Sequence, residues 1–193
     1  MRTKTNPVFV LSIVFAAVLL ILGVTAAGLI NSASAQEQKF TIKLSGSNEV
    51  PVVNTAGTGV AIFQLSADGK SLNYQLKLTK MNSVMGAHIH RGKQGENGPV
   101  VAGLFNAAMS GPPTGAVNGQ LSKGTITSAD LKGPLAGQQI SDLVNLLKTD
   151  GAYINVHTSQ NQNGEIRGQV SSGTNTPVSN PSASTTTSSS PGY

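Results

Sequence analysis

Residues 59–80, GVAIFQLSADGKSLNYQLKLTK, indicate which kind of fold this chain adopts. The second half of this segment alternates apolar and polar residues, with one apolar face formed by Leu72, Tyr74, Leu76 and Leu78. Such alternation is typical of a β-strand with one buried face. The pair Asp68-Gly69 between the two apolar runs suits a tight turn, because glycine adopts a positive φ at little cost. The segment therefore predicts an antiparallel β-hairpin.

Short apolar runs on both sides of this hairpin predict more strands. We expect them over residues 39–44, 84–91, 99–105, 117–127, 152–158 and 165–170. Apolar residues at helical spacing predict one helix at about residues 138–148, and residues 106–116 are expected to form a loop. Hairpins with one short helix indicate an all-β fold, either an antiparallel β-sandwich or a Greek-key barrel.

The first 35 residues predict an export signal. They combine a basic start at Arg2 and Lys4, an apolar run over residues 8–30 and a small-residue cleavage site at Ala33-Ser34-Ala35. The apolar run is also long enough to span a bilayer, so an uncleaved N-terminal membrane anchor is the alternative. In that case residues 8–30 would be the contact with the membrane. Under both interpretations we expect a secreted or cell-surface domain, outside the cytoplasmic membrane.

The remaining chain divides into a folded part and a tail. Residues 36–171 have the length of one ordinary domain with a single core. Residues 172–193 are nearly all Ser, Thr, Pro, Asn and Gly, and such a segment buries too little apolar surface to offset its ordering entropy. We therefore predict a disordered Ser/Thr/Pro-rich tail.

Composition and motifs exclude several classes of function. The chain has no cysteine, which excludes a disulfide scaffold, a thiolate metal site and a cysteine nucleophile. The formal net charge is +5, but the basic residues are scattered, so no nucleic-acid partner is expected. No serine lies in a Gly-x-Ser-x-Gly elbow, and the glycine-rich segment 92–98 lies between predicted strands rather than before a helix. We predict no catalytic residues and identify no residues that bind an organic cofactor, and interpret the chain as a binding protein rather than an enzyme.

All three histidines lie in two of the predicted strands. Because side chains alternate along a strand, His88 and His90 share the face opposite to Ala87 and Ile89. The same alternation places Asn155 and His157 on the polar face of strand 152–158.

The last predicted strand adds charged residues to this polar surface. If strands 152–158 and 165–170 pair as a hairpin, Glu165 and Arg167 lie on the same surface as Asn155 and His157. For Glu165 and Arg167 themselves, the simplest expectation is a partly exposed ion pair.

Three imidazoles on one surface indicate a metal site. Neutral imidazole is a good ligand for copper and zinc. The sequence thus predicts one Cu or Zn ion with His88, His90 and His157 as ligands, and with Asn155, Glu165 and Arg167 around them. The structural alternative is that the histidines are polar residues of a wet sheet face, or hydrogen-bond to loops.

Four motifs in order resemble the CHRD (chordin-type) domain family. They are FTIKLSGSNEVP at 40–51, GVAIF at 59–63, AHIHRG at 87–92 with NGPVV at 97–101, and AYINVHT at 152–158 with GEIRGQV at 164–170. The resemblance covers about residues 38–171 and implies a secreted, single-domain microbial member of the family, with an extracytoplasmic β-rich fold. It further implies a binding or structural module without established catalysis, whose partner is a protein or a cell-surface component.

A second, local resemblance concerns the histidine strand. His88-x-His90 followed by a glycine-rich turn is similar to the copper-ligand strand of copper/zinc superoxide dismutase, and this resemblance implies His88 and His90 as ligands, with His157 in the place of a third. That enzyme needs more histidines than the three in this chain, so dismutase activity is not expected. The alternative function is therefore a single-site copper or zinc protein with limited redox activity.

Overall fold

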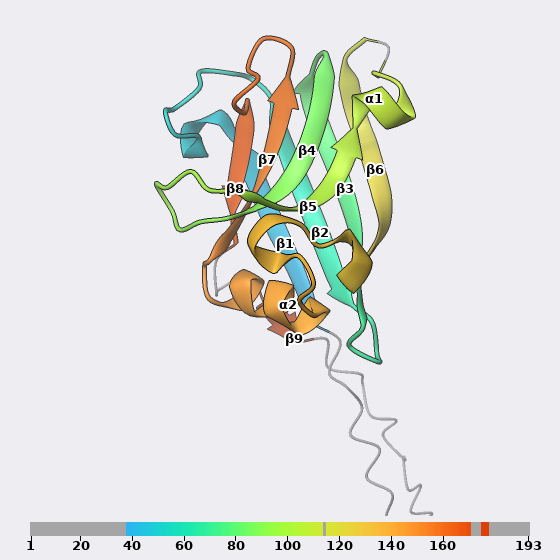
Figure 1. Ribbon diagram of the computed structural model, residues 1–193. Helices are drawn as coiled ribbons and strands as arrows, with labels where there is room; N and C mark the ends of the chain where they lie inside the picture. The colour runs from blue at the N-terminus through green and yellow to red at the C-terminus, as the bar shows by residue number, and fades with distance from the viewer. Residues whose placement is uncertain (1–37, 114, 171–174, 178–193) are drawn as a thin grey trace, which may run out of the picture. The chain divides into compact units, whose positions relative to one another are not determined.

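The computed structural model describes residues 38–113, 115–170 and 175–177 (Figure 1). The predicted export segment at residues 1–35 and most of the predicted tail at residues 172–193 lie outside the described residues, so both stay predictions. Within the described residues, no helix is long and apolar enough to cross a membrane.

The described chain is built almost entirely from strands, which confirms the all-β prediction. The strands are β1 (Gln38–Ser45), β2 (Thr58–Leu65), β3 (Ser71–Met81), β4 (Val84–Arg91), β5 (Val100–Asn106), β6 (Val117–Thr127), β7 (Ala152–Thr158), β8 (Ile166–Gln169) and β9 (Asn175–Pro177). The helices are α1 (Ala107–Ser110) and α2 (Ile140–Lys148), with single 3-10 turns η1 (Gly46–Asn48), η2 (Ser128–Asp130) and η3 (Gly133–Leu135).

The strands form one antiparallel sheet that curves into a nearly closed barrel (Figure 1). Their order is β5-β4-β7-β8-β1-β2-β3-β6, with β9 pairing β1 outside this path. The two end strands of the order approach each other, and the hydroxyl of Tyr74 on β3 donates to the carbonyl of Leu104 on β5 at 2.8 Å. This order makes β4, β7 and β8 neighbours, although β7 follows β4 by some 60 residues of chain.

The hairpin predicted over residues 59–80 is confirmed as β2 and β3. Their register pairs Gly59 with Leu78 and Phe63 with Tyr74. Gly69 in the connecting turn has a φ of +70°, the left-handed conformation that the Asp-Gly pair predicts. Leu72, Leu76 and Leu78 are buried in the barrel core and Tyr74 is partly buried, so the predicted apolar face of β3 is also correct.

Helix α2 and the turns before it pack against the barrel next to β5 and β7. The helix buries its apolar stripe, formed by Ile140, Leu143, Val144 and Leu147. It begins at Ile140 rather than at residue 138, because the backbone N–H of Gln139 is capped by the carboxylate of Asp142 at 3.0 Å.

The prediction of a plain loop over residues 106–116 is wrong at its start. Residues Ala107–Ser110 form the single turn α1, and the side-chain oxygen of Asn106 accepts from the backbone N–H of Ala108 at 2.9 Å. A helix of four residues has no room for an apolar period, so only the Asn cap signals it in the sequence.

Candidate metal centre

The three histidines come together because β4 and β7 are adjacent strands. In their antiparallel register His88 pairs with Asn155, and Gly86 pairs with His157. His88 and His90 alternate with the buried Ala87 and Ile89, so both imidazoles point away from the barrel core. The predicted shared face is therefore present.

Gly86 gives the His88 ring its place between the strands. A Cβ atom at Gly86 would lie 3.2 Å from Cε1 of His88, closer than an ordinary contact. The missing side chain leaves room for His88 to lean along β4 toward His157.

The imidazole rings converge on a common point. One ring nitrogen from each of His88, His90 and His157 lies within 4.8 Å of the other two. The ring centroids are 5.1 Å apart for His88 and His157, and 5.9 Å apart for each of the other two pairs. A single ion between the nitrogens can reach all three after small side-chain rotations, since metal–imidazole bonds are about 2.0–2.1 Å long.

Backbone carbonyls determine which nitrogen of two histidines carries the hydrogen. Nδ1 of His90 lies 2.8 Å from the carbonyl oxygen of Gly98, and Nδ1 of His157 lies 2.9 Å from that of Gln162. A carbonyl only accepts, so Nδ1 donates in both cases and Nε2 keeps its lone pair. A second hydrogen bond of this kind is what orients metal-binding histidines in proteins.

Three of the four other ring nitrogens are buried without a hydrogen-bond partner in the described part of the chain. They are Nε2 of His90, Nε2 of His157 and Nδ1 of His88. Buried polar atoms are nearly always paired in proteins, so three such atoms on three neighbouring imidazoles require an explanation. A bound cation would provide a partner for Nε2 of His90 and of His157, whose Nδ1 atoms are already occupied.

Burial keeps the imidazoles neutral. It lowers the pKa of His88 to about 4, with smaller contributions from the neighbouring His157, His90 and Lys132. Burial also lowers the pKa of His90 and of His157, against the opposing effect of their carbonyl partners. Neutral imidazoles are the form that binds metal, so at pH 7 no proton has to leave before an ion enters.

Arg167 on β8 supports His90 from behind. Its guanidinium nitrogen Nη2 donates to the carbonyls of Lys93 at 3.0 Å and Glu96 at 2.8 Å, which holds the loop that carries Gly98. Its Cζ also lies 3.5 Å from the ring centroid of Tyr153. That ring stacks on His90 with a centroid distance of 4.8 Å.

Glu165 supports His157 in a similar way. Its Oε2 accepts from the hydroxyl of Thr158 at 2.7 Å and from the side-chain amide of Asn161 at 3.2 Å. Its Oε1 accepts from the hydroxyl of Thr55 at 2.7 Å. These contacts fix the turn after β7, where the carbonyl of Gln162 receives the Nδ1 hydrogen of His157.

The predicted ion pair between Glu165 and Arg167 is wrong. Glu165 is 8% exposed and Arg167 is 1% exposed, and each has the separate partners described above. The prediction also assumed a solvated surface. Instead, the η1 loop covers it: Asn48 Nδ2 donates to the carbonyl of Arg167, and Asn97 Nδ2 donates to that of Val50.

Asn155 lies between the histidines and Arg167 because it pairs with His88 on one side and Arg167 on the other. It is 2% exposed, and its Nδ2 lies 3.3 Å from Oε2 of Glu49. Glu49, like Tyr153, was not among the residues that the sequence predicted around the histidines. Glu49 follows the 3-10 turn η1 in a loop without a hydrophobic period. The sequence pattern therefore does not indicate that this side chain is buried, although it is only 5% exposed.

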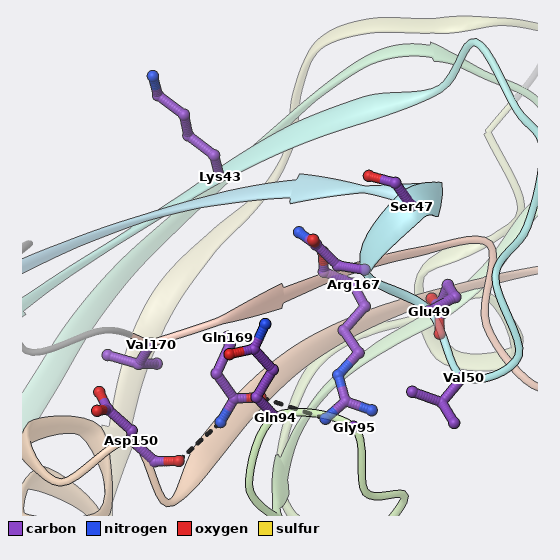
Figure 2. A pocket seen from close by; sticks show the side chains of 11 residues that line it. Lys43, Ser47, Glu49, Val50, Gln94, Gly95, Asp150, Arg167, Gln169 and Val170 are labelled. Atoms are coloured by element: carbon purple, nitrogen blue, oxygen red, sulfur yellow. Dashed lines mark hydrogen bonds between the residues drawn. The ribbon is translucent and has the colours of Figure 1, made fainter.

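Glu49 and Arg167 also border a polar cavity of about 440 Å³ on the side of β8 and β1 (Figure 2). Dashed lines in Figure 2 mark two hydrogen bonds of Gln169 at the wall of this cavity. Its Oε1 accepts from Arg167, and its Nε2 donates to the carbonyl of Asp150. Lys43 and Asp150 complete the charged lining, so acidic and basic groups are mixed. None of the three histidines lines this cavity.

The histidines border a different cavity of about 320 Å³. Its walls are Met85, Gly86, His88, His90, Val100, His157 and Gln162. Three neutral imidazoles at the wall of such a cavity form a ligand set for one ion with a coordination position left for another ligand.

Comparison with known families agrees with the fold and the motifs. A family model described as the CHRD domain matches residues 40–170, a range that includes all three histidines and runs from β1 to the end of β8. The resemblance predicted from the four motifs is therefore confirmed. Searches of the curated proteins and of the solved structures found no match to this chain.

Proposed function

This chain belongs to the CHRD domain family, and we propose that its domain binds one copper or zinc ion through His88, His90 and His157. Two observations carry the proposal: one ring nitrogen from each histidine lies within 4.8 Å of the other two, and each ring has a buried nitrogen without a hydrogen-bond partner in the described residues. Copper and zinc are the metals that a set of neutral imidazoles suits best.

The competing structural interpretation accounts for only part of the geometry. Hydrogen bonding to loops explains Nδ1 of His90 and of His157, which donate to the carbonyls of Gly98 and Gln162. It leaves Nε2 of both rings and Nδ1 of His88 buried and unpaired. Polar residues of a wet sheet face would be hydrated, whereas His90 is only 9% exposed.

The family and the sequence together favour an exported binding module. Residues 1–35 carry the features of an export signal or an anchor, and residues 172–193 have the composition of a solvated tail. We propose that residues 36–171 act as a metal-binding module outside the cytoplasmic membrane. Binding of a protein or cell-surface component stays a prediction from the family resemblance.

A bound copper ion would give the module limited redox chemistry, and a bound zinc ion would give it a Lewis acid. The chain's own residues position the ligands. Arg167 holds the loop behind His90, and Glu165 holds the turn behind His157. Support of this kind typically changes metal affinity by about 10–100-fold.

The test is a binding measurement on the untagged protein. Wild type and the His88→Ala/His90→Ala variant are equilibrated with Cu²⁺ or Zn²⁺, and bound metal is counted by mass spectrometry after gel filtration. We expect one ion per chain for the wild type and none for the variant, because a single remaining imidazole cannot retain the ion through the column.

The matched control is Lys77→Ala/Thr79→Ala, which removes two exposed side chains at the same spacing on β3. This control should bind like the wild type. A wild type that retains neither metal contradicts the proposal, and so does a histidine variant that retains a full equivalent.

A further inference from the structure

Met85 is a large apolar residue that is 51% exposed next to the histidines. Single exposed apolar side chains are common on protein surfaces and carry no meaning by themselves. Met85 differs from such residues because the register of β4 shifts at this position, and the shift determines on which side of the sheet the side chain lies.

A β-bulge places Met85 on the histidine face. In the β4–β7 register Val84 pairs with Thr158 and Gly86 pairs with His157, so Met85 is an extra residue on β4. Val84 and Ala87 are both fully buried in the core. Two residues instead of one therefore lie between successive core positions, and Met85 and Gly86 both lie on the outer side of the sheet. Bulges often direct a side chain toward a functional site in this way.

The cavity in front of the histidines shows where this side chain lies. Met85 lines the 320 Å³ cavity together with His88, His90 and His157. Gly86, which follows Met85 on β4 and pairs with His157, has no side chain to separate Met85 from the histidines. Met85 therefore borders the same cavity as the three histidines.

The chemistry of these four groups discriminates between the two proposed metals. Three imidazoles suit both zinc and copper, but a thioether is a soft ligand that favours Cu(I). Zinc in proteins takes nitrogen, thiolate and carboxylate oxygen ligands rather than thioethers. The chain has no cysteine, so methionine is the soft ligand available to it.

We propose that the sulfur of Met85 is a fourth ligand of the histidine site, and that it makes the site selective for Cu(I) over Zn²⁺. This inference rests on the proposed function, since it specifies the metal that the three histidines bind. It adds a residue that the bulge of β4, and not the His-x-His spacing, brings to the site.

The test replaces the sulfur and keeps the volume. In Met85→Leu, Cu(I) affinity is measured anaerobically by competition with a chromophoric Cu(I) chelator, and Zn²⁺ affinity by competition with a zinc dye. We expect the Cu(I) affinity to fall at least about tenfold, since even changes behind the ligands cost that much. The Zn²⁺ affinity should change less than about twofold, because Leu and Met have similar volumes and zinc does not use the thioether.

Met109→Leu is the matched control. Met109 is 85% exposed, and it borders a separate cavity that includes His88 but neither His90 nor His157. It should leave both affinities unchanged. In selenomethionine-substituted protein, X-ray absorption at the copper edge should show a selenium neighbour that disappears in Met85→Leu and remains in Met109→Leu.

The outcomes separate this inference from the proposed function. If the wild type binds Cu(I) and Met85→Leu binds it equally well, Met85 is not a ligand while the histidine site stands. An equal loss of Cu(I) and Zn²⁺ affinity in Met85→Leu overturns the selectivity and indicates a structural effect. If the wild type binds neither ion, both ideas fail.

Discussion

Arg167 shows how a buried charged side chain is tolerated in this domain. A buried charge is costly unless hydrogen bonds replace its water, and the carbonyls of Lys93 and Glu96 do so here. The planar guanidinium also stacks on Tyr153, which a lysine ammonium would not reproduce as well. The cost of burying Arg167 is thus offset by contacts that fix the loop behind His90.

Glu49 is a residue whose protonation should affect stability. Burial raises its pKa from the ordinary value of 4.5 to about 7, although Arg167 and the hydrogen bond from Asn155 act in the opposite direction. The folded protein therefore holds this proton more tightly than the unfolded chain does. Between pH 4.5 and about pH 7, the two pKa values, the contribution of Glu49 to the free energy of unfolding falls as the pH rises.

We predict that Glu49→Gln removes this pH dependence. The difference in free energy of unfolding, variant minus wild type, should grow by about 1–2 kcal/mol between pH 4 and pH 8. A fully dry carboxylate would give more, but Glu49 borders a cavity whose walls include exposed side chains. Urea unfolding at several pH values measures the difference. The histidines, whose pKa values are lowered, act in the opposite direction and cancel in the comparison.

The control for this measurement is Glu96→Gln, which changes an exposed carboxylate in the loop that Arg167 holds. Its stability curve should run parallel to that of the wild type. If the Glu49→Gln curve is parallel as well, Glu49 is ionised in the fold and its burial has no energetic effect on the proton.

At the scale of strands, the contact between β8 and β1 depends on a glycine. A Cβ atom at Gly168 would lie 2.6 Å from Cγ2 of Ile42 and 2.6 Å from the carbonyl oxygen of Lys43. The second of these atoms belongs to the backbone of β1, so it cannot move without shifting the strand. Because Gly168 has no side chain, β8 can lie this close to β1. This arrangement positions Arg167 next to the η1 loop.

We predict that Gly168→Ala lowers the free energy of unfolding by about 1–3 kcal/mol, the usual cost of overpacking a tight core. Thermal or urea unfolding of the apo protein measures this loss. Gly103→Ala on β5 is the control, because a Cβ atom there meets nothing within 4 Å. It should be neutral or slightly stabilising, since alanine lowers the entropy of the unfolded chain. Equal stability of the two variants would show that β8 can move away from β1.

The strands that the sequence predicts best are those with a regular period. The alternation in β3 and the Asp68-Gly69 turn determine the β2–β3 hairpin locally, and the His-x-His spacing correctly places two imidazoles on one face. The sequence could not predict that the η1 loop covers this face. The cover depends on a contact between distant segments, in which Asn48 donates to the backbone carbonyl of Arg167 on β8. The bulge at Met85 was not predictable either, because a bulge is defined by the register with a partner strand and the sequence alone does not give that register.

For the whole molecule, the proposed metal site joins strands that are distant in sequence. β4 carries His88 and His90, and β7 carries His157 after the intervening β5, β6 and α2. An ion held between them binds the folded chain and finds no such arrangement in the unfolded one. Metal should therefore stabilise the entire domain by mass action.

We predict that free metal at about 100 times its dissociation constant raises the free energy of unfolding by about 2.7 kcal/mol, if the unfolded chain binds none. Calorimetry or urea unfolding with and without buffered metal measures the increase. The His88→Ala/His90→Ala variant should unfold at the same point in both conditions, because the ligands are gone. An equal increase in this variant would show that the metal acts elsewhere. A wild type without any increase would mean that the three histidines do not bind the ion in the folded state.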